Sequence, residues 1–163
     1  MSIETKTLNQ ILDKIEQIAE AHQMINDHGN GHTADIGTDR EENRELVYPY
    51  LWTDYRDTQY ILAQNNRGIA YKLYTVQMMV LDKYSPNAKN SQEVMSDTEG
   101  ILSDVIQKLV NDRALKAFRV EIKTLVAQPV RDDEKDGVEG WMVAIAFKIP
   151  YQFCHKQLPI IED

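Results

Sequence analysis

Residues 141–149 alternate between large apolar side chains and smaller or polar ones, and this alternation constrains the fold more than any other feature. The apolar positions are Trp141, Val143, Ile145, Phe147 and Ile149. A strand with this period buries one face, so it predicts a sheet with a packed layer on one side. Residues 118–126 show the same alternation and predict a neighbouring strand. An acidic turn at 131–139 joins the two segments.

Two segments with helical spacing can supply the packed layer. The first spans roughly residues 5–25, and the second begins with a capping box at Ser96, or one turn earlier at Asn90 or Ser91. Each carries a single apolar stripe, which has to pack against another element. The predicted core joins both stripes to the strands through Leu8, Ile11, Ile15, Ile18, Ile101, Val105, Leu109, Val120, Ile122, Val143, Ile145 and Phe147.

Two more strands are expected between the helices. Residues 46–55 are rich in Tyr and Trp, and residues 69–81 in Tyr, Val and Met, which is typical of strands. Pro49 places the first of them at a sheet edge or a bulge, because proline cannot donate to the ladder. We therefore predict an α+β fold, with a four-stranded, mainly antiparallel sheet and two amphipathic helices on one face.

The chain length favours one domain over residues 1–163. Residues 28–45 are rich in glycine and charged side chains and predict a long surface loop, whereas residues 151–163 predict an irregular C-terminal tail. A chain of this length buries enough surface to fold without a disulfide. Cys154 is the only cysteine, so no intrachain disulfide is expected.

Charge and hydropathy exclude two classes of partner. The formal net charge is −8, which opposes tight binding to a phosphate backbone. The first residues are polar and lack the apolar centre of a signal peptide, and no apolar run is long enough to cross a membrane. We expect the protein to stay in a cytoplasm, or in a particle assembled there, and to bind no membrane.

Residues that could carry chemistry form no recognisable set. His28 and His32 are the best metal candidates, but the glycines around them predict a polar loop, and Cys154-His155 is the only other plausible ligand source. Cys154 and His155 point apart on an extended chain and so form no thiol–imidazole pair. No phosphate-binding, nucleophile or calcium-loop motif is present. We predict no catalytic residue, no metal and no cofactor.

The aromatic residues of 46–55 fall on both faces of the expected strand. Exposed Tyr and Trp at an edge strand suit a protein interface, and a role in the core is an equal alternative. The predicted loop at 28–45 and the acidic turn at 131–139 supply charged residues for the same purpose. The candidate interface residues are Tyr48, Tyr50, Trp52, Tyr55, Asp35, Arg40, Arg44, Asp133 and Asp136.

Several short motifs carry a family resemblance. They are Tyr48-Pro49, Leu81-Asp82, the sequence EVMSDT at 93–98 before ILSDVI at 101–106, DGVEGW at 136–141, and Pro150, Cys154 and Pro159. Over residues 46–159 the chain resembles phage tail terminator, tail completion and neck ring (head–tail connector) proteins, and is most similar to those of phages that infect Bacteroidetes.

The resemblance implies a structural virion protein without catalytic residues. Such proteins form a homo-oligomeric ring, a hexamer or a dodecamer, around the DNA channel of the neck or tail. The implied partners are further copies of the chain and other neck, portal or tail proteins. Genomic DNA only passes through the ring. The implied location is the virion, and the host cytoplasm during assembly.

Two other functions remain open. A small ferredoxin-like α+β enzyme or ligand-binding domain would have the same order of elements, and a pocket with convergent, perturbed acids would distinguish it. A monomeric adaptor or inhibitor is the other alternative, which a sizing column separates from a ring.

Overall fold

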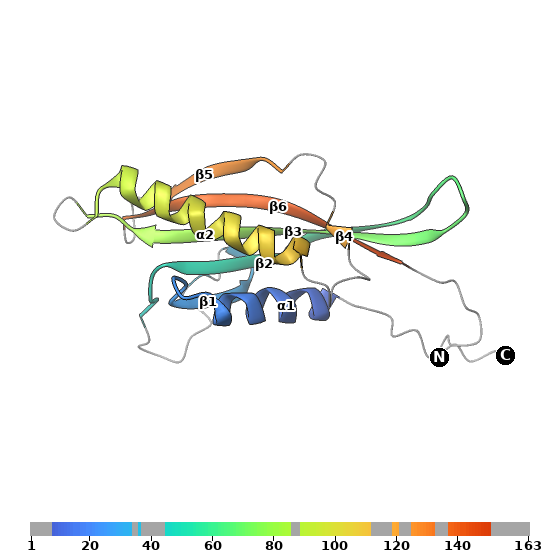
Figure 1. Ribbon diagram of the computed structural model, residues 1–163, viewed down its shortest axis with the longest axis horizontal. Coiled ribbons are helices and arrows are strands. Elements are labelled where there is room, and N and C mark those ends of the chain that lie inside the picture. Colours follow the sequence, from blue (N-terminus) through green and yellow to red (C-terminus); the bar gives the residue numbers. More distant parts are fainter. Residues whose placement is uncertain are drawn as a thin grey trace.

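The computed structural model describes residues 8–33, 36, 45–85, 89–111, 119–120, 125–132 and 137–150 (Figure 1). The elements are α1 (Leu8–Ala21), β1 (Asp27–Gly31), β2 (Tyr50–Gln64), β3 (Ala70–Lys83), α2 (Ser91–Asn111), β4 (Arg119–Val120), β5 (Ala127–Asp132) and β6 (Val138–Pro150). The predicted α+β class is confirmed. The predicted number of four strands is wrong, because the described residues form a six-stranded sheet.

The long strands β3 and β6 form the centre of the sheet. They pair antiparallel from Tyr71 opposite Pro150 to Lys83 opposite Val138. β2 pairs antiparallel with the other edge of β3, and β1 pairs parallel with the first residues of β2. β4 and β5 both pair with β6. The sheet is therefore mixed, with the order β1-β2-β3-β6 and two short strands beyond β6.

Strand β1 occupies residues that the sequence assigned to the 28–45 loop. A side chain at Gly29 would place its Cβ 2.5 Å from the Tyr50 hydroxyl and 2.8 Å from the Trp52 ring. Glycine at this position lets the backbone of β1 lie directly against the aromatic side chains of β2. The glycine-rich composition thus serves a close approach in a strand. Of the remaining expected loop, the structure describes residues 32, 33, 36 and 45.

In the second half of the chain, the short strands lie at other positions than the sequence predicts. The strand expected at 118–126 is described only at residues 119–120, which form β4, and at residues 125–126. β5 runs into the segment expected as an acidic turn. Val126, one of the apolar positions in the alternation at 118–126, is 63% exposed. Most β5 side chains are exposed, so no alternation marks this strand in the sequence. The tail at 151–163 lies outside the described residues.

The predicted core under two helices is confirmed. Its buried members include Ile11, Ile15, Ile18, Ile101, Val105, Leu109, Val143, Ile145 and Phe147, and the partly buried Leu8 and Val120 pack against them. Ile122 lies outside the described residues. Both apolar stripes therefore cover the same face of the sheet, although α1 is shorter than the predicted 5–25.

Helix α2 begins at Ser91, as the earlier of the two predicted starts has it. The Glu93 amide donates to Asn90 Oδ1 at 2.9 Å, and the Asn90 amide donates to Glu93 Oε2 at 3.2 Å. This reciprocal pair is a capping box and satisfies two amides at the helix start. The capping box predicted at Ser96 is wrong, because Ser96 lies inside the helix.

Candidate assembly surface

The aromatic residues predicted as interface candidates pack mainly against one another. Tyr50 and Trp52 are 1% and 3% exposed, and their rings stack with centroids 6.0 Å apart. Tyr48 meets Tyr50 edge to face at 6.3 Å. With Met79 and Leu81, Tyr50 and Trp52 form a second, smaller core on the sheet face away from the helices. Their burial inside the chain supports the core alternative for Tyr50 and Trp52.

For the other predicted interface residues, the structure gives less information. Tyr48 and Tyr55 are half-buried. The charged loop candidates Asp35, Arg40, Arg44, Asp133 and Asp136 all lie outside the described residues, so their interface role stays a prediction.

A different part of β2 exposes large apolar side chains together. β1 ends opposite Asp54, so within the described part of the chain no strand pairs with the outer edge of residues 59–64. We call the hairpin formed by residues 59–75 the hairpin arm. Figure 1 shows its turn extending well beyond the ends of both helices.

A bulge separates the hairpin arm from the buried part of β2. From Asp54 to Gln59 the chain advances five residues, whereas the facing strand advances two, from Gln77 to Thr75. Extra residues in one strand bend and twist a hairpin locally. The bulge therefore lets the arm take a direction of its own while it continues the sheet.

The surface of the hairpin arm is apolar and uncharged along β2. Tyr60, Ile61, Leu62 and Ile69 are 59%, 55%, 47% and 55% exposed. Because side chains alternate along a strand, Ile61 projects from the face opposite to that of Tyr60 and Leu62. Residues 58–66 contain no charged side chain, although 27% of the chain is charged. Large apolar side chains gathered on one short segment mark an interaction surface, unlike those scattered singly.

Hydrogen bonds hold the tip of the hairpin arm. Asn65 Oδ1 accepts from the Arg67 amide at 2.9 Å and from the Ile69 amide at 3.0 Å. Gly68 has a φ of 74°, which glycine adopts without strain, and its amide donates to the Asn65 carbonyl at 2.9 Å. The centroids of the facing Tyr60 and Tyr74 rings are 5.8 Å apart. Burial raises the pKa of Tyr74, and the electrostatic effect of Tyr60 raises it further. The arm is thus formed before any partner binds.

The groove between α1 and α2 is the feature most relevant to an enzyme. It has a volume of about 530 Å³ and is lined by Lys14, Gln17, Ile18, Ala21, His22, Asp104, Gln107, Lys108 and Asn111. The Met24 amide donates to His22 Nδ1 at 3.2 Å, so Nε2 carries the proton and donates to Asp104 Oδ2 at 3.4 Å. No Ser, Thr or Cys is among these described lining residues, so no hydroxyl or thiol nucleophile lies beside the His–Asp pair.

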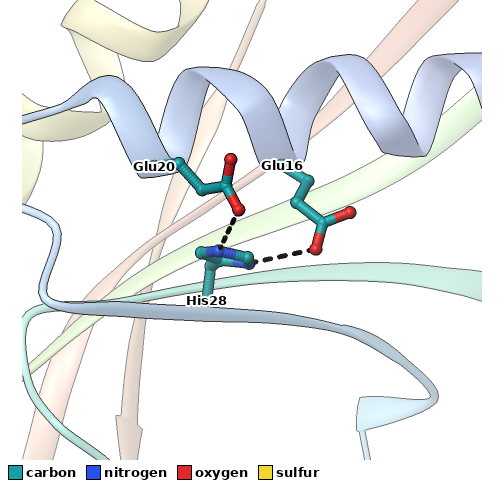
Figure 2. Close-up of side chains that lie close together, drawn as sticks. All are labelled: Glu16, Glu20 and His28. Atoms are coloured by element: carbon teal, nitrogen blue, oxygen red, sulfur yellow. Dashed lines mark ion pairs between the residues drawn. The ribbon is translucent and has the colours of Figure 1, made fainter.

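His28 has partners that the sequence did not suggest. Its ring lies next to Glu16 and Glu20 of α1 (Figure 2). This is the one group of three potential metal ligands among the described residues. Cys154 and His155, the only other plausible ligand source in the sequence, lie outside those residues.

Sequence reasoning missed both the arm and the α1 carboxylates. The signal for the arm was the uncharged run at 58–66, which ends within the Asn65–Gly68 turn. The signal for the carboxylates was the spacing of Glu16 and Glu20, which places two residues on one helix face.

Comparison with known proteins adds no relative. No family model matches the chain, and neither does any curated protein. Within the described residues, no helix combines the length and the apolar character needed to cross a membrane.

Proposed function

We propose that the chain is a structural subunit of a homo-oligomeric ring in the neck or tail of a phage particle, as a head–tail connector or tail terminator around the DNA channel. The observation that carries the proposal is the hairpin arm, in which an open strand edge and exposed Tyr60, Ile61 and Leu62 coincide. In the ring, the arm contacts the neighbouring copy of the chain.

An open edge of this kind favours a heterologous contact. Soluble proteins protect edge strands with charges, proline or bulges, because unpaired amides and carbonyls recruit other strands. β5, near the opposite edge of the sheet, carries Pro129 and Arg131. Residues 59–64 carry neither proline nor charge. A ring is built from contacts in which one patch meets a different patch on the next subunit, so one unprotected edge per subunit is sufficient.

The energy of such a contact suits assembly from soluble subunits. Burying an exposed large apolar side chain contributes roughly 1.5–3 kcal/mol. Three or four such side chains on the arm offset part of the cost of association, which is several kcal/mol for two free proteins. A single contact between two subunits is therefore weak. In a closed ring, the binding free energies of all the contacts add up.

The phage setting rests on the family resemblance and is supported by charge. A wall that DNA slides past must not hold phosphates, and a formal net charge of −8 meets this requirement. The further partners proposed on this basis are portal, neck or tail proteins at the two ends of the ring.

Photo-crosslinking from the arm tests the proposal. The variant Ile61→p-benzoylphenylalanine, irradiated as purified protein and in phage particles that contain the chain, is expected to crosslink to a second copy of the same chain. A matched Val110→p-benzoylphenylalanine variant, at an exposed position of α2, reports crosslinking that does not depend on the arm. Absence of the chain from particles, or equal crosslinking from both positions, would contradict the proposed ring.

A small-molecule-binding function is the second candidate, because of the groove with the His22–Asp104 pair. Screening a metabolite library by the change in melting temperature tests it. Stabilisation that disappears in His22→Gln and persists in Ile61→Lys would favour this function over the ring.

A further inference from the structure

The packing of β1 determines where His28 points. Gly29 faces the rings of Tyr50 and Trp52, and no side chain fits there. Neighbouring residues on a strand point to opposite faces, so His28 is directed to the helix-covered face, where α1 lies. The parallel pairing of His28 with Leu51 fixes this register. The imidazole is thus held against α1 by the sheet and not by a loop.

Helix α1 presents two carboxylates to this imidazole. Glu16 and Glu20 are four residues apart and so lie one turn apart on the same face of the helix. Glu16 Oε1 is 3.9 Å from His28 Nδ1, and Glu20 Oε1 is 4.0 Å from Nε2. Figure 2 shows both carboxylates directed toward the same ring, which comes from β1 below them. One ligand atom from each of the three residues lies within 4.8 Å of the others.

We propose that Glu16, Glu20 and His28 form a binding site for a divalent transition-metal cation such as Zn²⁺. One imidazole nitrogen and two carboxylate oxygens are a ligand set that these ions accept, with solvent at the remaining position. The ion joins the outer strand of the sheet to the helix that covers it.

The distances agree with a site that closes around the ion. Ligand atoms about 2.0–2.2 Å from a tetrahedral Zn²⁺ lie about 3.4 Å from one another. The observed 3.9 and 4.0 Å are about half an ångström longer, a difference that the glutamate torsions absorb. Both glutamate side chains are partly exposed, at 46% and 64%, so they are free to move.

A small rotation of the ring completes the ligand set. The two carboxylates face different nitrogens of His28, and a neutral imidazole binds a metal through only one of them. A cavity of about 10 Å³ lies beside the ring and is bordered by Glu16, Ala19 and Leu51. This space holds about one water-sized sphere, and the ring uses it to turn one nitrogen toward both carboxylates.

The cation would also stabilise α1, because Glu16 and Glu20 carry the same charge. Two carboxylates four residues apart on a helix repel each other and weaken it. A divalent cation between them removes this repulsion and adds a contact from helix to sheet. Binding to the folded chain alone therefore raises its melting temperature in proportion to the logarithm of the free metal concentration.

Calorimetric titration of the full chain with ZnCl₂, after removal of metal by a chelator, tests the site. We expect one ion per chain, with binding at least about tenfold weaker in Glu16→Gln/Glu20→Gln and in His28→Gln, since even changes around the ligands of known sites cost about 10–100-fold. Asp13→Asn, which removes an exposed carboxylate from the same helix, and His22→Gln are expected to bind as the unaltered chain does.

A second measurement separates metal binding from effects on folding. The melting temperature of the unaltered chain is expected to rise with ZnCl₂ and to return with chelator. In Glu16→Gln/Glu20→Gln it is expected to be unchanged by either. Absence of binding in the unaltered chain, or affinity preserved in both site variants, would overturn the proposal. Both results are independent of whether the chain forms a ring.

Discussion

The first half of β2, residues 50–54, and its second half, residues 59–64, belong to one strand and have opposite surroundings. The first half pairs with β1 on one edge and β3 on the other, and its Leu51 and Trp52 side chains are buried on opposite faces of the sheet. Even Asp54 is buried there, and its Oδ2 accepts from the Thr33 amide at 2.9 Å. The second half has an open edge and exposed apolar side chains.

The first half of β2 stabilises the fold, whereas the second half is available for recognition. Apolar side chains in the first half lose contact with water on folding, so they stabilise the fold. Apolar side chains in the second half remain in water in the isolated chain, so they contribute little to folding. They are available to a partner at no cost to the core.

Truncating one leucine in each half gives the largest expected contrast. Leu51→Ala is expected to lower the free energy of unfolding by about 2–5 kcal/mol, because Leu51 is fully packed in the core. Leu62→Ala is expected to change it by less than about 0.5 kcal/mol, because the side chain is exposed. Chemical denaturation measures both. Similar losses for the two variants would show that the two halves of β2 do not differ in their contribution to stability.

Gly29→Ala tests how tightly β1 closes the edge of the first half. The added methyl group would lie 2.8 Å from the Trp52 ring, so overpacking is expected to cost about 1–3 kcal/mol. Gly100→Ala is the matched control, because it lies in α2 and the added Cβ would meet no neighbouring element within 4 Å. There the change is expected to stabilise the chain by about 0.4–1 kcal/mol. A neutral Gly29→Ala would show that β1 is loosely packed.

Lys89 makes a smaller, pH-dependent contribution to stability. It lies at the end of the sheet next to the first half of β2. Its Nζ is 2.7 Å from Asp82 Oδ2 and 2.8 Å from Asp97 Oδ2. The hydrogen bonds to Asp82, then Asp97, raise the pKa of Lys89 above 10.5. A group with a raised folded-state pKa stabilises fully below the unfolded value and loses this effect as the pH rises through the folded value.

Stability is therefore expected to fall above about pH 10.5 more steeply in the unaltered chain than in Lys89→Met. Unfolding in denaturant across pH 9–12 measures the difference. Identical pH profiles would show that the Lys89 ion pairs contribute no net stability.

Periodicity explains which parts of the fold were predictable. The alternation at 141–149 and the stripes of both helices each encode one buried face, and these elements and their core were predicted correctly. β5 and the second half of β2 are largely exposed, so no burial pattern marks them. β1 was not predicted, because glycine is typical of loops. The reason for a glycine in this strand is the close Trp52 ring, which the sequence alone does not show.

The candidate sites depended on contacts between distant residues. Spacing within α1 shows that Glu16 and Glu20 share a face, but only the register of β1 against β2 directs His28 toward them. The sequence left Tyr50 and Trp52 with two equal alternatives, core or interface. Their burial depends on tertiary packing, because residues of β1 and β5 cover them. The exposed surface begins a few residues later, after a bulge that has no sequence signature.

Native mass spectrometry of Ile61→Lys beside Val110→Lys tests whether copies of the chain assemble through the hairpin arm. Both positions expose an apolar side chain, one on the hairpin arm and one on α2. The unaltered chain and Val110→Lys are expected to give the same closed oligomer, whereas Ile61→Lys is expected to give folded monomers with an unchanged free energy of unfolding. An oligomer that survives in Ile61→Lys, or an unaltered chain that is monomeric at every concentration, would contradict assembly through the arm.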